Sequence, residues 1–334
     1  MSKESDQYLI NYCDELVVKI YVGLTESKNE PDIPAVIPLL LFQTILDKIR
    51  AIQLLYESGE SRVGDSSYGI VRAVFECQWS LLYILKEDTE FRSLSYYYFS
   101  RLEEAKKNLG HLNYLLSLRE SSLNKRQDNL GSIELDQKRY RKAEERGDSA
   151  RLEQLSKKYE ADGLSPVEVM DLKMKRVQAM ISELTTTIEA MKRDKVLAEM
   201  QIQVIEREPQ FAHLRHELSL VPKKKVRRPS WFSLKSHIGT IYALAEHLGL
   251  EDQYEGPYGT FSQETHGLNA TKQIALKGDK AILRNKEEST KNIEAKEAFH
   301  AGIYILLSIV LKFLNYYGKQ DEVKELRRTM SSMQ

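Results

Sequence analysis

The sequence predicts an all-α protein, a helical bundle that carries a long inserted antiparallel coiled-coil hairpin. The 334-residue chain holds only 16 Gly and 8 Pro, and these helix breakers gather at a few places. Between them, apolar residues recur at steps of three and four, which is the period of an α-helix. A very polar stretch over about 90–208, rich in Glu, Lys, Arg, Gln and Leu, separates two strongly apolar regions.

The helices before that stretch are predicted from periodicity and from their ends. Apolar residues have helical spacing over about 7–24, and a loop with two prolines follows at 29–34. A second helix is expected from about Pro38, since proline is tolerated in a first turn, to Glu57. Asp65 or Ser66 can cap a third helix that ends near residue 85. This third helix has almost no polar face, which predicts burial on most sides.

The polar stretch is expected to form an arm. Breaks are predicted at Gly131, Gly147 and 162–163, and Ser165-Pro166 followed by Glu168 is a typical helix start. Apolar residues then recur at helical steps over 170–191, so we expect two long antiparallel helices joined near residue 163. The alternative is an ordinary extension of the bundle. The predicted domains are a discontinuous core, 1–100 and 210–334, and an inserted arm, 101–209.

After the arm, Pro209 and a basic linker at 222–229 precede the last helices. Helices are predicted over 231–248, about 254–268 and 295–317, with a loop over 278–285. The most apolar run, 301–311, is shorter than the roughly 20 residues that span a bilayer, so no membrane association is expected.

Composition limits the classes of function. Lys plus Arg equals Asp plus Glu at 49 each, so any binding to nucleic acid must come from a local patch. Cys13 and Cys77 lack metal-ligand spacing, and the polar N-terminus is unlike a signal peptide, which together favour a reduced cytoplasmic compartment. Phosphate-cradling glycine loops and clustered metal ligands are absent from the sequence, so no cofactor and no metal are expected.

Arg72 and Glu76 form the first candidate site. They are four residues apart and therefore share one face of the third helix. Buried charges are costly unless they are paired or hydrogen-bonded, so two charges in an apolar helix need partners or a purpose. Two interpretations stay open: a structural ion pair, or an arginine that binds a phosphate or carboxylate with Glu76 holding it or acting as a base.

A second candidate site is a series with spacing four, four and four: Tyr254, Tyr258, Ser262 and His266. On a continuous helix these side chains form one slowly drifting stripe. Gly256-Pro257 interrupts the first turn, so the helix is expected to begin near residue 257. Aromatic residues at helical spacing are usually core, but a Ser and a His one turn apart on a tyrosine-lined face also fit a functional pocket.

Two signatures in the chain resemble those of a mostly bacterial family, domain of unknown function family 5677. The first is VRAVFE at 71–76, followed by Trp79 and by Tyr83 with its neighbours Ile and Leu. The second is Trp231, an alanine-rich stretch at 242–245, and the Tyr–Tyr–Ser–His series. The resemblance covers roughly 40–100 and 228–317, and the arm departs from the family's more compact pattern.

That resemblance implies an all-helical domain with Arg72, Glu76, Ser262 and His266 as its polar centre, and it implies no known reaction. A weaker resemblance is to HEPN-like helical domains, many of which are metal-independent ribonucleases of toxin and phage-defence systems. Their usual Arg-to-His spacing within one helix is matched only at Arg207 and His213, with Pro209 between them, so this second resemblance is at the level of the fold.

The basic run at 223–228, with Lys224 and Arg227, is the third candidate site. Such clusters attract phosphates in a salt-dependent way, although most charge runs are solvated linkers. RNA or another nucleic acid is therefore one possible partner.

Two functions follow from these candidates. In an enzyme acting on RNA or another phosphodiester, His266 would be the general acid/base, Arg72 would stabilise phosphate charge, Glu76 would orient Arg72, and Ser262 would position His266 or substrate. Substrate contacts would come from Tyr83, Tyr254, Tyr258, Lys224 and Arg227. In the alternative, the chain is a scaffold whose 101–209 arm engages a protein partner or a second copy.

Overall fold

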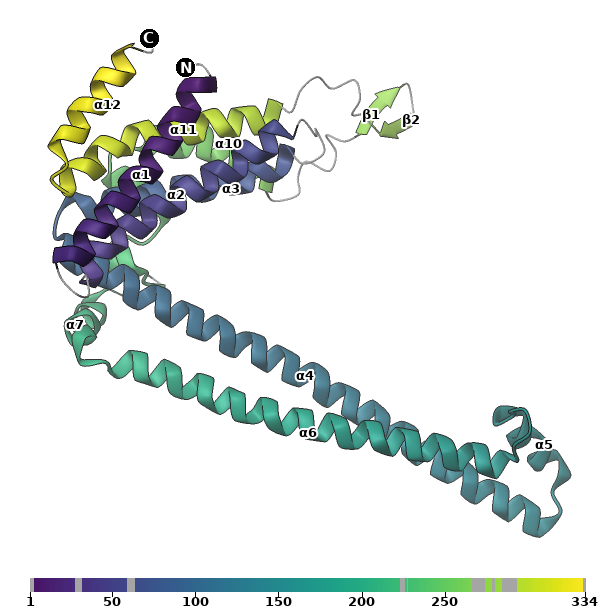
Figure 1. Ribbon diagram of the computed structural model, residues 1–334. Helices are drawn as coiled ribbons and strands as arrows, with labels where there is room; N and C mark the ends of the chain where they lie inside the picture. Colours follow the sequence, from purple (N-terminus) through teal and green to yellow (C-terminus); the bar gives the residue numbers. More distant parts are fainter. Residues whose placement is uncertain are drawn as a thin grey trace. The chain divides into compact units, whose positions relative to one another are not determined.

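The computed structural model describes residues 3–27, 32–58, 64–222, 226, 228–265, 274–277, 280–283 and 293–332 (Figure 1). The chain divides into two compact units: Met1–Phe99 with Gln210–Gln334, and Ser100–Pro209. We call the first the core unit and the second the arm. Both consist almost entirely of helices, which confirms the all-α prediction.

The first part of the core unit contains α1 (Lys3–Ser27), α2 (Ile33–Glu57), α3 (Gly64–Lys86) and the start of α4 (Thr89–Arg146). Its second part contains η2 (Pro209–Phe211), α7 (Ala212–Leu220), η3 (Trp231–Ser233), α8 (Ile241–His247), α9 (Glu251–Gln253), η4 (Tyr254–Tyr258), α10 (Gly259–Thr265), α11 (Ile293–Tyr316) and α12 (Gln320–Ser332). Two short antiparallel strands, β1 (Ile274–Lys277) and β2 (Lys280–Leu283), pair with each other, and β2 lies within the segment 278–285 that was predicted to be a loop.

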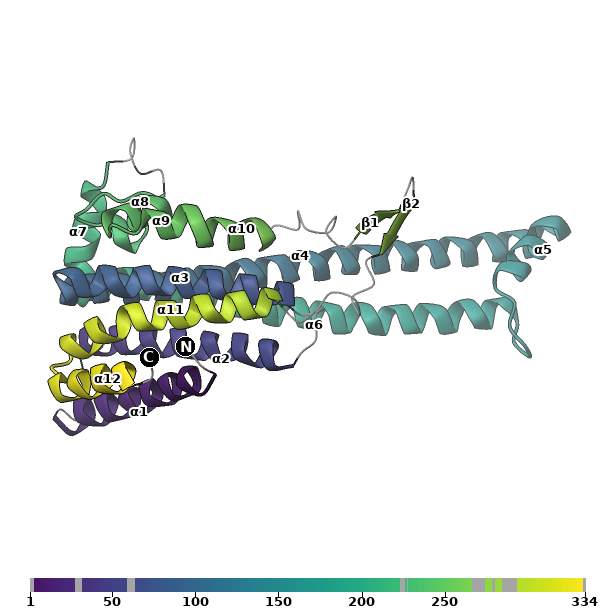
Figure 2. The same cartoon turned by 90° about the horizontal axis from the view of Figure 1, so that it is seen from above.

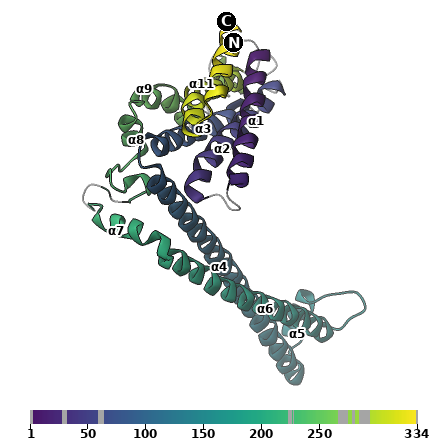
Figure 3. The ribbon, with the colours of Figure 1, turned by 60° about the vertical axis from the view of Figure 1, so that its left-hand side comes forward.

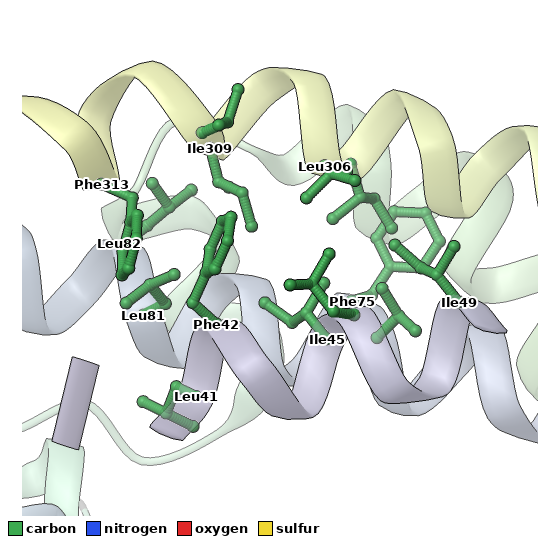
Figure 4. Packing of buried hydrophobic residues seen from close by; sticks show 14 of the residues in the cluster. Leu41, Phe42, Ile45, Ile49, Phe75, Leu81, Leu82, Leu306, Ile309 and Phe313 are labelled. Atoms are coloured by element: carbon green, nitrogen blue, oxygen red, sulfur yellow. The ribbon is translucent and has the colours of Figure 1, made fainter. Parts of the chain in front are cut away.

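Helices α2, α3 and α11 pack side by side at the centre of the core unit, and α10 lies along α3 (Figure 2). Apolar side chains of α2 face those of α11, and the rings of Phe42 and Phe313 stack with centroids 4.0 Å apart (Figure 4). A Cβ at Gly302 would lie 3.0 Å from Cγ1 of the fully buried Ile49. The absence of a side chain at Gly302 therefore sets the close approach of α2 and α11.

Helix α11 is longer than the apolar run 301–311 at its centre. In the described part of the chain, it is the one helix that is long and apolar enough to cross a membrane. More than half of its most apolar stretch is buried. Its contacts with α2 and α3 are those expected of the central helix of a bundle.

The arm contains the rest of α4, α5 (Ser149–Lys158) and α6 (Pro166–Arg207), with α4 and α6 running together in Figure 3. The predicted start of α6 is confirmed, because Ser165 and Glu168 form a reciprocal capping box in front of Pro166. The predicted break at Gly131 is wrong, since this residue lies inside the 58-residue α4. Gly147 does end α4, with φ of 67°, whereas Gly163, with φ of 76°, lies in the turn between α5 and α6.

Contacts within the arm join α4 to α6 along much of their length. The Lys192 ammonium pairs with Glu120 at 3.2 Å, and the Gln137 amide donates to Asp171 at 2.6 Å. A small apolar cluster forms near the tip, from Ile133, Tyr159, Val169, Met170 and Val177. Coiled-coil packing of the two helices is not confirmed and stays a prediction.

Two predicted helix limits in the core unit are wrong. Helix α2 begins at Ile33, so Pro34 occupies the first turn and Pro38 lies inside the helix. The segment 231–248 is not one helix, because Lys235 and His237 have φ of 60° and 55° between η3 and α8. Positive φ is incompatible with a right-handed helix, and the Ser233 hydroxyl fixes this turn by donating to the Ile238 carbonyl at 2.6 Å.

Candidate functional site

Arg72 and Glu76 of α3 meet Tyr258, the last residue of the η4 turn. Arg72 Nε donates to Glu76 Oε1 and to the Tyr258 hydroxyl, both at 3.2 Å. The Tyr258 hydroxyl in turn donates to Glu76 Oε1 at 2.8 Å. The structure therefore brings together three of the predicted site residues, one of them from the far end of the sequence.

The Arg72–Glu76 ion pair is only partly buried. The Arg72 side chain is 31% exposed and that of Glu76 is 39% exposed, although the rest of α3 is largely buried. The pair lies at the edge of the α3–α10 contact, where water reaches the charges. Solvent screening makes the pair weaker than a buried one and leaves the guanidinium reachable from outside.

The protonation states in this network follow from its surroundings. Burial, and then the Glu76 carboxylate that accepts its hydrogen bond, raise the pKa of Tyr258 to about 12, so the hydroxyl stays neutral and can donate. Burial lowers the pKa of Arg72, but its partners Tyr258 and Glu76 outweigh burial and leave that pKa above its ordinary value. Arg72 is therefore a permanent cation.

Aromatic stacking fixes the position of Tyr258. Its ring centroid lies 4.9 Å from that of Trp79 and 4.9 Å from that of Tyr254. The indole N–H of Trp79 donates to Gln253 Oε1 at 3.3 Å. In the π-helical turn η4, Gly259 lies close to the backbone, since a Cβ there would lie 3.2 Å from the Tyr254 carbonyl oxygen. Tyr254 is therefore part of the helical segment, and the predicted helix start at Pro257 is wrong.

The other half of the predicted polar centre is only partly described. Ser262 is half-buried in α10, one helical turn after Tyr258. His266 lies outside the described residues, and so do Lys224 and Arg227 of the basic linker. Arg228, which is described, is exposed. The roles of these residues remain predictions.

Tyr83 does not join the Arg72 network. It is buried, its hydroxyl lies 2.5 Å from Ser236 Oγ, and the Arg92 guanidinium lies 3.8 Å above its ring. Arg92 also donates to the Tyr83 carbonyl and to the Glu87 carboxylate. Arg92 was not among the residues predicted from the sequence. The sequence hardly distinguishes Arg92 as a buried residue, because an arginine in the first turns of a helix usually lies at the surface.

A cleft of about 340 Å³ adjoins Tyr83 and Arg92 and is lined by these two residues, Trp231 and Lys235 among others. Asp88 and Lys235 pair at 2.5 Å across it, and both have positive φ. Because each cation in this cleft already has a carboxylate partner, the arrangement reads as a structural junction between α3, α4 and η3.

In the described part of the chain, no three His, Cys, Asp or Glu side chains are placed to hold a metal ion. The Arg72 network itself offers a cation, a carboxylate and a neutral phenol. Such a set can bind an oxyanion, and Glu76 can accept a proton.

Comparison with known families supports the first resemblance. The model of a family of unknown function, DUF5677, matches residues 35–167. The matched residues include Arg72, Glu76 and Tyr83, continue into the arm, and end before the second signature. The chain thus resembles that family over this range, and the HEPN-like resemblance is not confirmed. No curated protein and no solved structure matches the chain.

Proposed function

We propose that the chain is an assembly protein that associates with a second copy of itself through the arm. The observation that carries this proposal is a set of large apolar side chains exposed on α6. They are Val196, Leu197, Met200 and Val204, and their exposures are 52%, 63%, 55% and 59%. We call them the α6 stripe. Exposed apolar surfaces that are contiguous commonly mark protein–protein contacts.

The stripe is one face of the helix. Leu197, Met200 and Val204 follow Val196 by one, four and eight residues. At 100° per residue, all four side chains therefore lie within an arc of about 100° around the helix axis. Ile188 and Ile205 point the other way and are buried. The inward face of α6 is therefore satisfied within one chain, and the stripe is surplus to it.

Helix α4 adds to this surface. Tyr114 and Leu118, one turn apart, are 62% and 47% exposed. The Lys192–Glu120 ion pair brings this part of α4 to the level of the stripe. A groove of about 430 Å³ at the end of α6 is lined by Met200, Val204 and Pro209 among others. The α6 stripe thus lies beside a recess, and Tyr114 and Leu118 are further exposed apolar side chains on α4.

The charges around the stripe favour a second copy as its partner. Acidic and basic side chains are nearly equal in number along 100–209, and they alternate over short distances. A surface of mixed sign has no net attraction for a strongly acidic or basic partner, but it can pair with itself about a two-fold axis. The arms of two copies would then bury their stripes against each other.

The test compares two substitutions of exposed leucines. Leu197→Glu places a charge in the stripe, whereas Leu54→Glu, on α2, is the matched control at 69% exposure. Glu and Leu are both good helix formers, so neither change should unfold its helix. Light scattering after size exclusion should give a single-copy mass for Leu197→Glu and the wild-type mass for Leu54→Glu. An unchanged mass for both variants would exclude the stripe.

A second candidate is the phosphodiester enzyme, which is favoured by the reachable guanidinium of Arg72 beside Tyr258 and Glu76. Arg72 would stabilise charge on phosphate, and His266 would supply the acid/base group. The test is RNA cleavage by the purified protein with a chelator present. Arg72→Ala and His266→Ala should each abolish cleavage, and equal activity in all three proteins would refute this candidate.

A further inference from the structure

A cleft of about 420 Å³ opens in the arm between α4, the end of α5 and α6. Four cations line it: Arg126 from α4, Lys158 from α5, and Lys173 and Arg176 from α6. Asn129 and Ser132 add neutral polar groups. No acidic side chain lines the cleft in the part of the chain that the structure describes. Three segments of sequence thus build a basic cleft that no local run of charges reveals.

The buried ring of Tyr159 organises two of these cations. Lys158 Nζ lies 5.5 Å and Lys173 Nζ 4.9 Å from its ring centroid. The Tyr159 hydroxyl donates to Asp136 Oδ2 at 3.0 Å. Because a ring face attracts cations, Tyr159 lowers the cost of holding two ammonium groups near one another.

Asp136 anchors this arrangement beneath the cleft. Lys158 Nζ donates to its carboxylate at 2.5 Å, and this bond is the main reason that the pKa of Asp136 is lowered. Asp136 is therefore ionised, and it offsets one positive charge. Arg126, Lys173 and Arg176 pair with no carboxylate within the described residues. The cleft keeps a positive excess that its own structure does not neutralise.

We propose that this cleft binds the phosphate groups of a polyphosphate chain, from either a nucleic-acid backbone or a free inorganic polyphosphate. The two guanidinium groups can each hold a phosphate through paired N–H donors, and the two ammonium groups add point charges. Four cations around one cleft suit several linked phosphates better than a single carboxylate. The chain as a whole has no net charge, so the attraction is local to this cleft.

The proposal goes beyond both functions considered above, since neither uses these residues. It also differs from the prediction that nucleic acid binds the linker at 223–228. The two basic sites can be separated by substitution, because Lys224 and Arg227 lie outside the arm.

The first test measures fluorescence anisotropy of a short labelled single-stranded RNA with the full chain. The cleft variant is Arg126→Gln with Arg176→Gln. Its matched control is Arg141→Gln with Arg193→Gln, which also removes one exposed arginine from α4 and one from α6. The cleft variant should bind about tenfold more weakly or worse, as expected for losing charge-assisted contacts, and the control should bind like wild type.

Salt dependence supplies a second readout. Four cations on a single strand predict a slope of about −3 for the logarithm of affinity against the logarithm of salt concentration. The cleft variant should retain roughly half of that slope. A slope that is the same for wild type and cleft variant would contradict the proposal.

Inorganic tripolyphosphate distinguishes the two sources of phosphate. If it displaces the RNA, linked phosphates suffice; if it does not, the site needs an extended backbone, and both results keep the cleft as the site. The proposal is overturned if neither probe binds, if the control variant loses as much affinity, or if Lys224→Gln with Arg227→Gln abolishes binding instead. The mass of the cleft variant, measured in parallel, should stay that of wild type, which separates this result from self-association.

Discussion

The Tyr258 hydroxyl donates to the Glu76 carboxylate at 2.8 Å, across 182 positions of sequence, and this bond ties α3 to the last third of the chain. Tyr258→Phe removes the bond and keeps the ring, so it should lower the free energy of unfolding by about 1 kcal/mol. Both tryptophans, Trp79 and Trp231, are in the core unit, so their fluorescence during urea unfolding reports on that unit. Tyr304→Phe, at a 64% exposed position, is the control and should have no effect.

Removing the carboxylate itself tests how strongly the ion pair contributes. If the Arg72–Glu76 pair were completely buried, Glu76→Ala would lower the free energy of unfolding by about 3–5 kcal/mol. With both side chains about a third exposed, we expect a loss of about 1 kcal/mol by the same fluorescence measurement. A loss of 3 kcal/mol or more would mean that the network is shielded from water, against the exposure described above.

Two glycines give opposite predictions for the same substitution. Gly302→Ala should destabilise the core unit by about 1–3 kcal/mol, because its Cβ crowds Ile49 where two central helices meet. Gly131→Ala has open space around it in α4, so the gain in helix propensity should stabilise the arm by up to about 1 kcal/mol. Tryptophan fluorescence should report the first change, and helical circular dichroism the second. A stabilising Gly302→Ala would show that the α2–α11 contact is loose.

Acid should weaken the tip of the arm through Asp136. Its folded pKa is lowered, mainly by the Lys158 hydrogen bond, so its contribution to stability is present above the ordinary pKa of 3.8. That contribution is lost as the pH falls through the lowered pKa. We therefore expect the melting temperature, followed by helical circular dichroism, to fall more steeply below about pH 4 in wild type than in Asp136→Asn. Parallel declines in the two proteins would contradict the assigned role of Asp136.

Helical periodicity and capping residues were sufficient to predict the fold class and several helix ends, because these are local properties. The capping box at Ser165 and the end of α4 at Gly147 are examples. Gly131 was predicted to break a helix and Pro38 to begin one, but both lie inside helices. A long helix can contain a weak helix former, because tertiary packing and the neighbouring turns stabilise it. The turn at Lys235 and His237 carries no glycine to announce its positive φ.

For the candidate sites, too, the local properties could be predicted and the tertiary ones could not. The spacing of Arg72 and Glu76 predicted that they share one face of a helix, and the four-residue steps pointed to Tyr258. The exposure of these side chains depends on how α10 lies along α3, which the spacing does not reveal. The basic cleft of the arm could not be predicted, because Arg126, Lys158 and Arg176 come from three helices and lie in short basic stretches that are far apart in the sequence. Charge runs such as 223–228 attract attention in a sequence, whereas a cleft is assembled only by folding.

The central claim, that two copies associate through the α6 stripe, is tested most directly by the mass of the unmodified chain in solution. Sedimentation equilibrium over a dilution series should give twice the 38.6 kDa of one chain at high concentration, falling toward a single chain on dilution. A mass of 38.6 kDa at every concentration would contradict the account.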